Sequence, residues 1–557
     1  MAAKHHVGGT KKHHVGGSKS TEEAIIEAAG YKIEKWLGSG AYGSVAEVAD
    51  AQDNVWAAKI MHPADYLFDG PNASQVRETA TLGELDHPNI VPIHHIFRDV
   101  GSRHLVVVMP LADKNLDEAI KEFKKPLSVS KKEQEKDIER RKRYAHEIVC
   151  GMEYLWDRGF VHLDLKPANI LIDSDDEAVI ADFGLSQSRF RDQTAVEKPP
   201  NKLVTWWWRA PELQCGLLKY DERADYWSLG LVLLELFFFG VRPFSLVGDD
   251  DSKLLEGIGA KLGFPAKFIN RVKSEEKHWS SRIREDRETN LPIVAEQLRE
   301  CILTIEPFET ELESLLPPLA VDIVNRLIGP EQAELAEQYY GSSFFLLVSD
   351  FIGNLLHVDP DDRILGNISV VFGDFPCPRI IPFTGLVQIP IEHFAQLFKS
   401  SKKIPAVWRL SENVFLVAEH IWRRLSHLEH KEEERDFAIL RIAAKLLSET
   451  HRANYLLKNF ASELEEYKVA ETEFEIESQL DFSAWKTALG TEIERIQAPV
   501  PKFLPPASFP SSSSSFSVLP AAAPAAAAVA RKSPPRPLSS PPPLFRRSSP
   551  RTPHKFR

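Results

Sequence analysis

One stretch of the chain decides its fold and organises the rest: Val161-His162-Leu163-Asp164-Leu165-Lys166-Pro167-Ala168-Asn169-Ile170-Leu171. The triplet Asp182-Phe183-Gly184 follows eleven residues later. The apolar runs at 170–172 and 178–180 predict two short buried strands, so the charged residues fall on the loops beside them. Because active sites favour such loops, the stretch is a candidate catalytic centre.

The polar side chains of this stretch suit the transfer of a phosphoryl group. Asp164 can accept the proton of an attacking hydroxyl, and Lys166 can neutralise the γ-phosphate of a nucleotide. Asn169 and Asp182 can hold Mg²⁺ on the phosphates. Few other chemistries need these residue types at this spacing, so a chance match is a weak alternative.

A second cluster lies near the N-terminus, where a predicted strand at 31–37 leads into a glycine-rich run: Gly38-Ser39-Gly40-Ala41-Tyr42-Gly43-Ser44-Val45. Its glycines, Gly38, Gly40 and Gly43, let the backbone close over phosphates without a clash at Cβ. A GxGxxG pattern alone is weak, but here a second strand follows it and Ala57-Ala58-Lys59 comes next. That order predicts a nucleotide site.

These motifs, taken in order, resemble the eukaryotic protein kinase family over about residues 31–375. The resemblance implies an α+β, two-lobed kinase fold that uses ATP and Mg²⁺. Lys59 would then bind the α and β phosphates, with Val45 beside the nucleotide. The segment 72–78 looks like the cyclin-docking helix of cyclin-dependent kinases, and it makes Glu78 the partner of Lys59.

The resemblance extends to the adenine site and the substrate loop. A buried strand is expected at 105–109, with Met109 at the gatekeeper position and Leu111 and Ala112 in the hinge that meets adenine. Residues 203–212 resemble the substrate-binding loop of the group containing cyclin-dependent and mitogen-activated kinases, which favours proline after the phosphoacceptor Ser or Thr. Arg363 is expected to pair with Glu212.

Domain boundaries follow from these motifs. We expect a kinase N-lobe at 21–112 and a C-lobe at 113–380, with an insertion around 249–345 whose function the sequence does not reveal. Helical periodicity over 140–156 leads into the catalytic stretch. Thr21 is the expected cap of a short helix over 22–29 that Gly30 ends.

A second resemblance, to the cyclin box, lies in the all-α segment 381–497. The helices expected at 410–426 and 437–447 match its pattern, with Lys445 and Glu473 where cyclins place the Lys and Glu that contact their kinase. Glu475 and Glu477 depart from that pattern, because cyclins usually have apolar residues there. The alternative is a helical adaptor that recruits another protein.

Both ends of the chain are predicted to be disordered. Residues 1–20 contain the repeat KHHVGGTK, KHHVGGSK, which we interpret as a flexible arm with adventitious metal affinity. Residues 498–557 are rich in Pro, Ser and Ala and cannot offset their ordering entropy by burial. This tail contains Ser533-Pro534-Pro535-Arg536 and Thr552-Pro553-His554-Lys555, the pattern that cyclin-dependent kinases prefer in substrates.

Charge and cysteine usage exclude some classes of protein. The net charge of −12 becomes −21 over residues 1–497 once the nine Lys and Arg of the acid-free tail are removed, which argues against direct nucleic acid binding by the folded part. The four cysteines form no CxxC pair, which suggests a reducing compartment. No membrane span or secretory signal is recognised, so an intracellular protein, in cytoplasm or nucleus, is expected.

The sequence therefore predicts an ATP- and Mg²⁺-dependent kinase acting on Ser/Thr-Pro sites, with its own cyclin-like domain, or another kinase or cyclin, as partner. The alternative is a pseudokinase or scaffold. One departure concerns the activation loop: Leu163 and Gln187 replace two of the three arginines that grip a phosphothreonine in relatives, and Pro200 stands at the acceptor position. Arg77 alone remains, so we expect a loop that needs no phosphate.

Overall fold

The computed structural model describes residues 20–40, 43–62, 71–99, 101–123, 130–190, 206–245, 251–282, 291–310, 319–375, 388–401, 410–425, 432–447, 452–453 and 466–480. Apart from Ser20, the predicted arm and tail lie outside these residues. No helix in the described part is long and apolar enough to cross a membrane.

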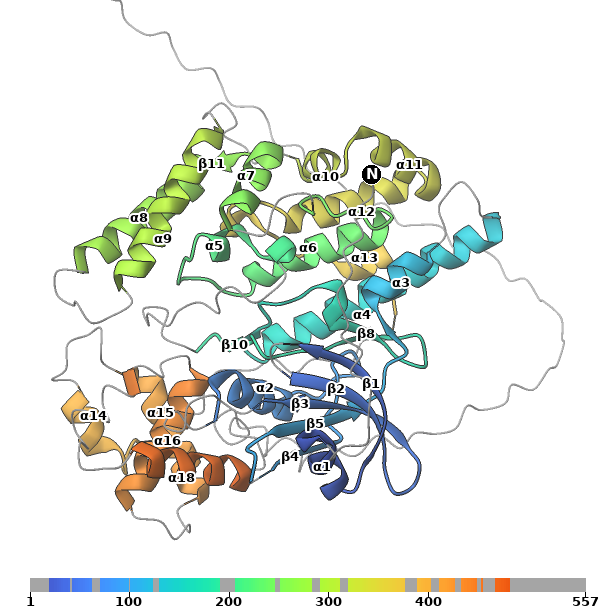
Figure 1. Ribbon diagram of the computed structural model, residues 1–557. Helices are drawn as coiled ribbons and strands as arrows, with labels where there is room; N and C mark the ends of the chain where they lie inside the picture. Colours follow the sequence, from blue (N-terminus) through green and yellow to red (C-terminus); the bar gives the residue numbers. More distant parts are fainter. Residues whose placement is uncertain are drawn as a thin grey trace, which may run out of the picture. The chain divides into compact units, whose positions relative to one another are not determined.

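The N-terminal lobe is built on a five-stranded antiparallel sheet with the order β1-β2-β3-β5-β4 (Figure 1). The strands are β1 (Lys32–Gly40), β2 (Gly43–Ala49), β3 (Val55–Met61), β4 (His95–Arg98) and β5 (Leu105–Pro110). Alternate residues of β2, β3 and β5 point to opposite faces, as strand geometry requires. One face carries Lys59 and the other is apolar and fully buried.

A short helix, α1 (Thr21–Ala28), covers the apolar face through Ile25 and Ile26. The prediction that Thr21 caps this helix is wrong, because Ser20 is the cap. The Ser20 hydroxyl accepts from the Glu23 backbone N–H at 3.2 Å, and the Glu23 carboxylate accepts from the Ser20 N–H at 3.0 Å. This reciprocal pair is a capping box, whose Ser-x-x-Glu pattern was present in the sequence.

The other face of the sheet meets α2 (Ala73–Glu84), whose first turn Asn72 caps. A small sheet, β6 (Lys114–Asn115), β8 (Ile170–Ile172) and β9 (Ala178–Ile180), lies in the second lobe, and β7 (Phe160–Val161) pairs with β10 (Gln187–Ser188). The strands predicted at 170–172 and 178–180 are confirmed as β8 and β9. The catalytic stretch runs between β7 and β8.

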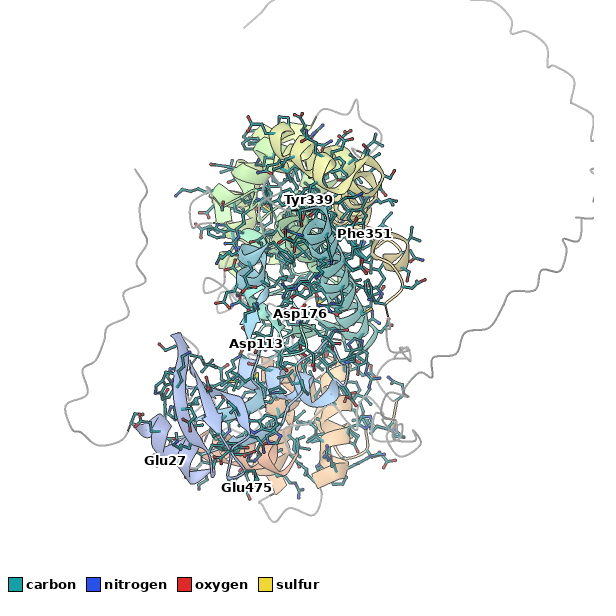
Figure 2. The ribbon with its side chains drawn as sticks, turned by 90° about the vertical axis from the view of Figure 1, so that its right-hand side faces the viewer. Glu27, Asp113, Asp176, Tyr339, Phe351 and Glu475 are labelled. Carbon is teal, nitrogen blue, oxygen red and sulfur yellow. A yellow bond between two sulfur atoms is a disulfide. The ribbon has the colours of Figure 1, made fainter. Side chains whose placement is uncertain are left out.

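The second lobe is helical, and its core lies around α4 (Lys131–Asp157) and α6 (Arg223–Phe237). The helix expected at 140–156 starts nine residues earlier, because Ser130 and Glu133 form another capping box. The shorter elements α3 (Leu116–Glu122) and α5 (Pro211–Gln214) flank this core. Figure 2 shows the side chains of this lobe, with Asp176 on the β8–β9 turn and Tyr339 and Phe351 among its later helices.

The segment predicted as an insertion is helical: α7 (Asp251–Leu262), α8 (Ala266–Arg282), α9 (Leu291–Ile305), α10 (Ala320–Ile328), α11 (Pro330–Tyr340) and α12 (Ser342–Leu355). A disulfide joins Cys215, just after α5, to Cys301 on α9. The spacing of the cysteines did not predict this pair, and it runs against the expectation of a reducing compartment. Cys150 is buried and takes no part in a disulfide, and its sulfur lies 3.5 Å from His146 Nδ1.

A group of helices follows the kinase-like region: α14 (Ala395–Ser401), α15 (Glu412–Leu425), α16 (Glu432–Leu446) and α18 (Glu466–Gln479). The helices expected at 410–426 and 437–447 are therefore present as α15 and α16, the second with five more residues at its start. The later helix that carries Glu473 is α18.

Candidate active site

Three charged side chains from different elements meet on the inner face of the sheet. The Lys59 ammonium, on β3, donates to Glu78 Oε1 of α2 at 2.6 Å and to Asp182 Oδ1 at 2.9 Å. Glu78 is almost fully buried, and its ion pair with Lys59 holds α2 close to the sheet. Ser74, one turn before Glu78, donates to the Gly184 carbonyl at 2.6 Å and so ties the same helix to the Asp182-Phe183-Gly184 triplet.

The charges of this cluster depend on one another. Burial by itself lowers the pKa of Lys59, but attraction to Glu78 and Asp182 outweighs it and raises that pKa. Burial raises the pKa of the Asp182 carboxyl, yet the lysine reverses this and the pKa is lowered. The pKa of Glu78 is raised, because its burial outweighs the attraction of Lys59. Lys59 thus stays a cation and Asp182 an anion at neutral pH.

The catalytic stretch forms a second polar cluster between β7 and β8. The Lys166 ammonium donates to Asp164 Oδ2 at 2.7 Å, and the Asn169 amide nitrogen donates to the same oxygen at 2.9 Å. Burial raises the pKa of Asp164 to about 6, although Lys166 acts against the shift. The charge of Asp182 contributes to this shift, so the two clusters are electrostatically linked.

A buried carboxylate, Asp225 at the start of α6, holds the backbone of this stretch. It accepts from the N–H groups of His162 at 2.7 Å and Leu163 at 2.8 Å. Leu163 and Asp182 both have positive φ, 65° and 66°, which costs free energy for residues other than glycine. The fixed hydrogen bonds of Asp225 stabilise that conformation at Leu163. In the sequence, Asp225 is the one carboxylate at the start of a long apolar run. Its role in holding the backbone of the catalytic stretch was not predicted.

The glycine-rich run falls at the end of β1 and the start of β2, and its residues 41–42 lie outside the described residues. Gly38 and Gly40 lie in β1, Gly43 opens β2, and Val45 pairs in register with Lys59. Gly43 has φ of 150°, and a Cβ there would lie 2.0 Å from the Ile60 carbonyl oxygen. Glycine is therefore required at this position for β2 to pair with β3, in addition to any approach to phosphates.

The predicted adenine side lies at the end of β5. Met109 is half-buried and pairs with Ala57 of β3, while Leu111 and Ala112 follow the strand and are also half-buried. Met109 contacts the apolar cores of both lobes. The sequence-predicted residues of the two lobes thus come from β1, β2, β3, α2, β5 with the β5–β6 connection, the catalytic stretch and the Asp182 triplet.

The donor set fits a nucleotide with Mg²⁺ better than a metal held by protein alone. Among the described residues, no group of three or more His, Cys, Asp and Glu is placed to hold a metal ion. Mg²⁺ instead suits one or two protein oxygens together with substrate phosphates. Asp182 and the Asn169 amide oxygen are of that kind, and Lys59 supplies a cation for phosphate.

Past the triplet, the expected pair between Arg363 and Glu212 is present and fully buried, with bonds of 2.7 and 2.8 Å between the two planar groups. Trp208 is buried and Trp207 half-buried in the stretch just before Glu212. Gln187, expected to lack a phosphate-binding role, accepts from the Tyr220 hydroxyl at 2.6 Å. The other expected loop positions, Pro200 and residues 203–205, lie outside the described residues.

Comparison with known proteins finds protein kinases as relatives of this chain. The family model of the protein kinase domain matches residues 31–367. Mitogen-activated protein kinase 13 of Oryza sativa subsp. indica is 32% identical over 257 residues, which are 45% of this chain and 48% of that protein. Cyclin-dependent kinase 7 of Carassius auratus is 32% identical over 239 residues, 42% of this chain and 64% of that protein. The chain spans about half the length of the first relative.

Proposed function

Because the chain belongs to the protein kinase family, we propose that it transfers the γ-phosphoryl group of ATP to Ser or Thr side chains of proteins. The observation that carries the proposal is the pairing of Lys59 with both Glu78 and Asp182, since it unites β3, α2 and the catalytic region in one arrangement. A scaffold that only binds partners has no need of all three charges. Bound MgATP would supply the phosphoryl group, with its charge neutralised by the metal.

The residues then act mainly by position and charge. Lys59 and the backbone around Gly38, Gly40 and Gly43 orient the phosphates, while Asn169 and Asp182 hold Mg²⁺. Asp164 accepts the hydroxyl proton of the substrate, and Lys166 stabilises the charge that develops on the phosphoryl oxygens. With a pKa of about 6, Asp164 is largely ionised at pH 7 and still basic enough to take a proton.

Transfer of radiolabelled γ-phosphate to a Ser-Pro peptide tests this function. The matched control is Asp164→Asn, which keeps the shape of the side chain and removes the base. We expect transfer by the wild-type chain and a loss of at least about 10²-fold in the variant. No label from the wild type would support the pseudokinase alternative, and equal label from both proteins would exclude Asp164 as the base. A Ser-Ala peptide measures the preference for proline, which the likeness of 203–212 to its relatives suggests.

We further propose that the C-terminal helices activate the kinase in the same chain, as a cyclin-like domain does. Arg77 of α2 donates to the Lys445 carbonyl at the end of α16 at 3.2 Å. The next residue on α2, Glu78, pairs with Lys59. Arg77 thus links α2 to the C-terminal helices, and Glu78 links it to the catalytic cluster. Lys445 and Glu473 form a buried pair at 2.5 Å, which fixes the end of α16 that meets Arg77.

A second contact supports the same docking. The guanidinium groups of Arg98 and Arg103, on either side of the β4–β5 turn, lie 4.9 and 5.0 Å from the ring centre of Phe474. Arg103 also lies 3.8 Å from the carboxylate of Glu471. Cation–π contacts of this kind are each worth about 0.5–1 kcal/mol at exposed sites. Because both parts share one chain, the effective concentration is on the order of millimolar, which is enough to hold a weak interface.

Contacts made by Phe190, Gln187 and Arg77 support an activation loop that needs no phosphate. Asn413 of α15 donates to the Phe190 carbonyl at 2.8 Å, and Tyr220 donates to Gln187. Arg77, the one arginine kept from the phosphate site of relatives, is turned to Lys445. We propose that these contacts, none of which involves an anion, take the place of the phosphothreonine.

Truncation at about residue 385 tests the activating role of the helices. Lower phosphorylation by the truncated chain, with an unchanged circular dichroism melt of the remaining lobes, supports activation in cis. Full activity after truncation supports an adaptor that recruits another protein. Adding the separate helical segment back in trans should restore part of the activity if docking is the cause.

A further inference from the structure

The turn that carries Arg363 is acidic and lies directly behind the substrate-binding stretch. Asp359, Asp361 and Asp362 stand within four residues, and the Asp359 side chain is fully buried. Arg363 leaves this turn to bind Glu212 through two parallel bonds and also donates to the His357 carbonyl at 2.7 Å. Any shift of this acidic turn, 359–362, therefore moves Glu212 and the stretch before it.

Cations from the insertion helix α8 hold the acidic turn in place. Lys267 donates to Asp362 Oδ1 at 3.0 Å. Arg271 donates to Asp359 Oδ1 at 3.2 Å and also binds Asp361. Burial raises the pKa of the Asp361 carboxyl, but Arg271 and Arg223 outweigh it and the pKa is lowered. Three neighbouring carboxylates would repel one another without these cations, so the turn depends on α8, together with Arg223 of α6, for its charge balance.

The loop between α5 and α6, residues 215–222, lies between the insertion and the activation segment. On the insertion side, Lys219 lies 3.4 Å from Glu275 of α8, and a Cβ on Gly216 would come within 3.0 Å of the Gln297 side chain on α9. The Cys215–Cys301 disulfide joins the same loop to α9. On the other side, Tyr220 binds Gln187 of the activation segment.

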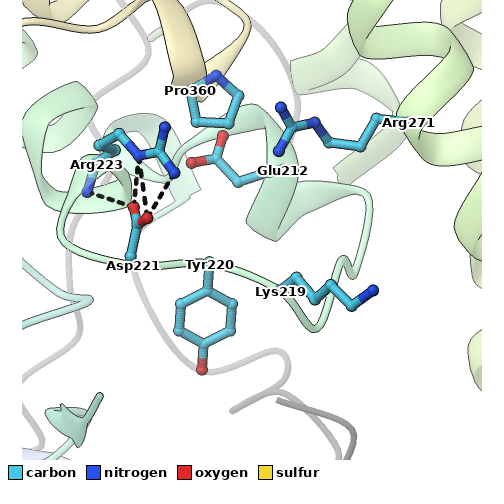
Figure 3. A pocket seen from close by; sticks show the side chains of 7 residues that line it. All are labelled: Glu212, Lys219, Tyr220, Asp221, Arg223, Arg271 and Pro360. Carbon is cyan, nitrogen blue, oxygen red and sulfur yellow. Dashed lines mark hydrogen bonds and ion pairs between the residues drawn. The ribbon is translucent and has the colours of Figure 1, made fainter.

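These two attachments meet in one pocket. Figure 3 shows Glu212 with Arg223 on one side and Arg271 on the other, and with Pro360 of the acidic turn beside them. Arg223 binds Asp221 of the α5–α6 loop at 2.9 Å and Asp361 of the acidic turn at 2.5 Å. Residues of the α5–α6 loop, the acidic turn and α8 therefore line one pocket together with Glu212.

We infer that the insertion helices α8 and α9 brace the segment that binds the protein substrate, and that Arg271 is a positioning residue for the reaction. The inference rests on the proposed kinase function and gives the insertion a role. Arg271 acts through Asp359 and Asp361, then Arg363, then Glu212. Loss of these contacts misplaces the substrate peptide and leaves the nucleotide cluster of Lys59, Glu78 and Asp182 unchanged.

The test is Arg271→Gln in the full chain, with Lys273→Gln as the matched control. Lys273 lies on the same helix and pairs with Glu306 at 2.7 Å, away from the acidic turn. We expect the KM for a Ser-Pro peptide to rise roughly fivefold in Arg271→Gln, a modest effect because the arginine is partly exposed. The KM for ATP should stay unchanged. In Arg271→Lys, which keeps the positive charge, the KM for the peptide should stay close to the wild-type value.

Hydrogen exchange gives a readout that needs no catalysis. Amides of 213–223 should exchange faster in Arg271→Gln than in Lys273→Gln, at equal free-thiol content of the two proteins. Equal exchange in the two variants would overturn the brace, and so would an equal rise in KM for ATP and peptide. If the wild-type chain transfers no phosphate, the proposed function fails, while the exchange comparison still decides whether α8 braces the loop.

Discussion

Removal of one buried carboxylate, in Glu473→Gln, tests the link between the C-terminal helices and the kinase. Glu473 is fully buried on α18 and lies between two cations, 2.5 Å from Lys445 Nζ and 2.9 Å from Arg441 Nε. Both cations are buried on α16, with 2% of each side chain exposed. The substitution keeps the volume and removes the charge, so it leaves the two cations without their shared anion.

The expected loss of stability is large. Removing one partner of a buried ion pair costs about 3–5 kcal/mol, because the remaining charge cannot regain its hydration. A domain typically has about 5–15 kcal/mol of stability in total, so α15, α16 and α18 should lose a large part of theirs. The exposed neighbour Glu475 on the same helix provides the control, and Glu475→Gln should cost less than about 0.5 kcal/mol.

Urea unfolding and peptide phosphorylation measure the two consequences. Hydrogen exchange of α16 assigns the destabilised transition to these helices, since a chain with several domains need not unfold in one step. Because the α16 end that binds Arg77 should loosen, phosphorylation should fall to the level of the chain truncated at about residue 385. Unfolding of Glu473→Gln at the same urea concentration as Glu475→Gln would refute the structural reasoning. Normal activity of an evidently destabilised variant would refute the docking proposal alone.

Four further outcomes are expected. The rate of phosphate transfer should fall as pH drops through about 6, because protonation of Asp164 removes the base; a flat profile between about pH 5 and 8 would exclude that role. Gly43→Ala should destabilise the N-lobe by about 1–3 kcal/mol, seen as a lower melting temperature, since the new Cβ overlaps the Ile60 carbonyl. Phosphatase treatment should leave activity nearly unchanged, and so should Thr194→Ala, which removes the remaining plausible phosphate acceptor of the activation loop and lies outside the described residues; a loss of activity restored by loop phosphorylation would contradict this. Mass spectrometry after incubation with ATP should find phosphate first in the tail, at Thr552 among others, where no acid repels it, and phosphate confined to the folded lobes would exclude the tail as a substrate.

Local motifs were enough to predict which charged side chains the fold brings together. The stretch around Asp164, the Asp182 triplet and Lys59 combine residue types that phosphoryl transfer requires at spacings set by short strands and loops. The strands 170–172 and 178–180 were also predictable, because a run of apolar residues between polar loops depends on neighbours in sequence. Resemblance predicted that Lys445 and Glu473 together contact the kinase. In the structure the two side chains pair with each other, and it is the Lys445 carbonyl that accepts from Arg77.

Other features depended on contacts that no local pattern reports. The starts of α1 and α4 differ from the predictions although their capping boxes are local. Ser20 caps α1 in place of the neighbouring Thr21, and the box at Ser130 starts α4 before its apolar periodicity begins. The long-range contacts had no such signal. The Cys215–Cys301 disulfide and the grip of Arg271 on the acidic turn join residues 86 or more positions apart. A side chain's chemistry can be read from its sequence neighbours, but its partner across the fold is set by how whole helices pack, so the sequence determined the reactive groups and the tertiary structure decided what holds them in place.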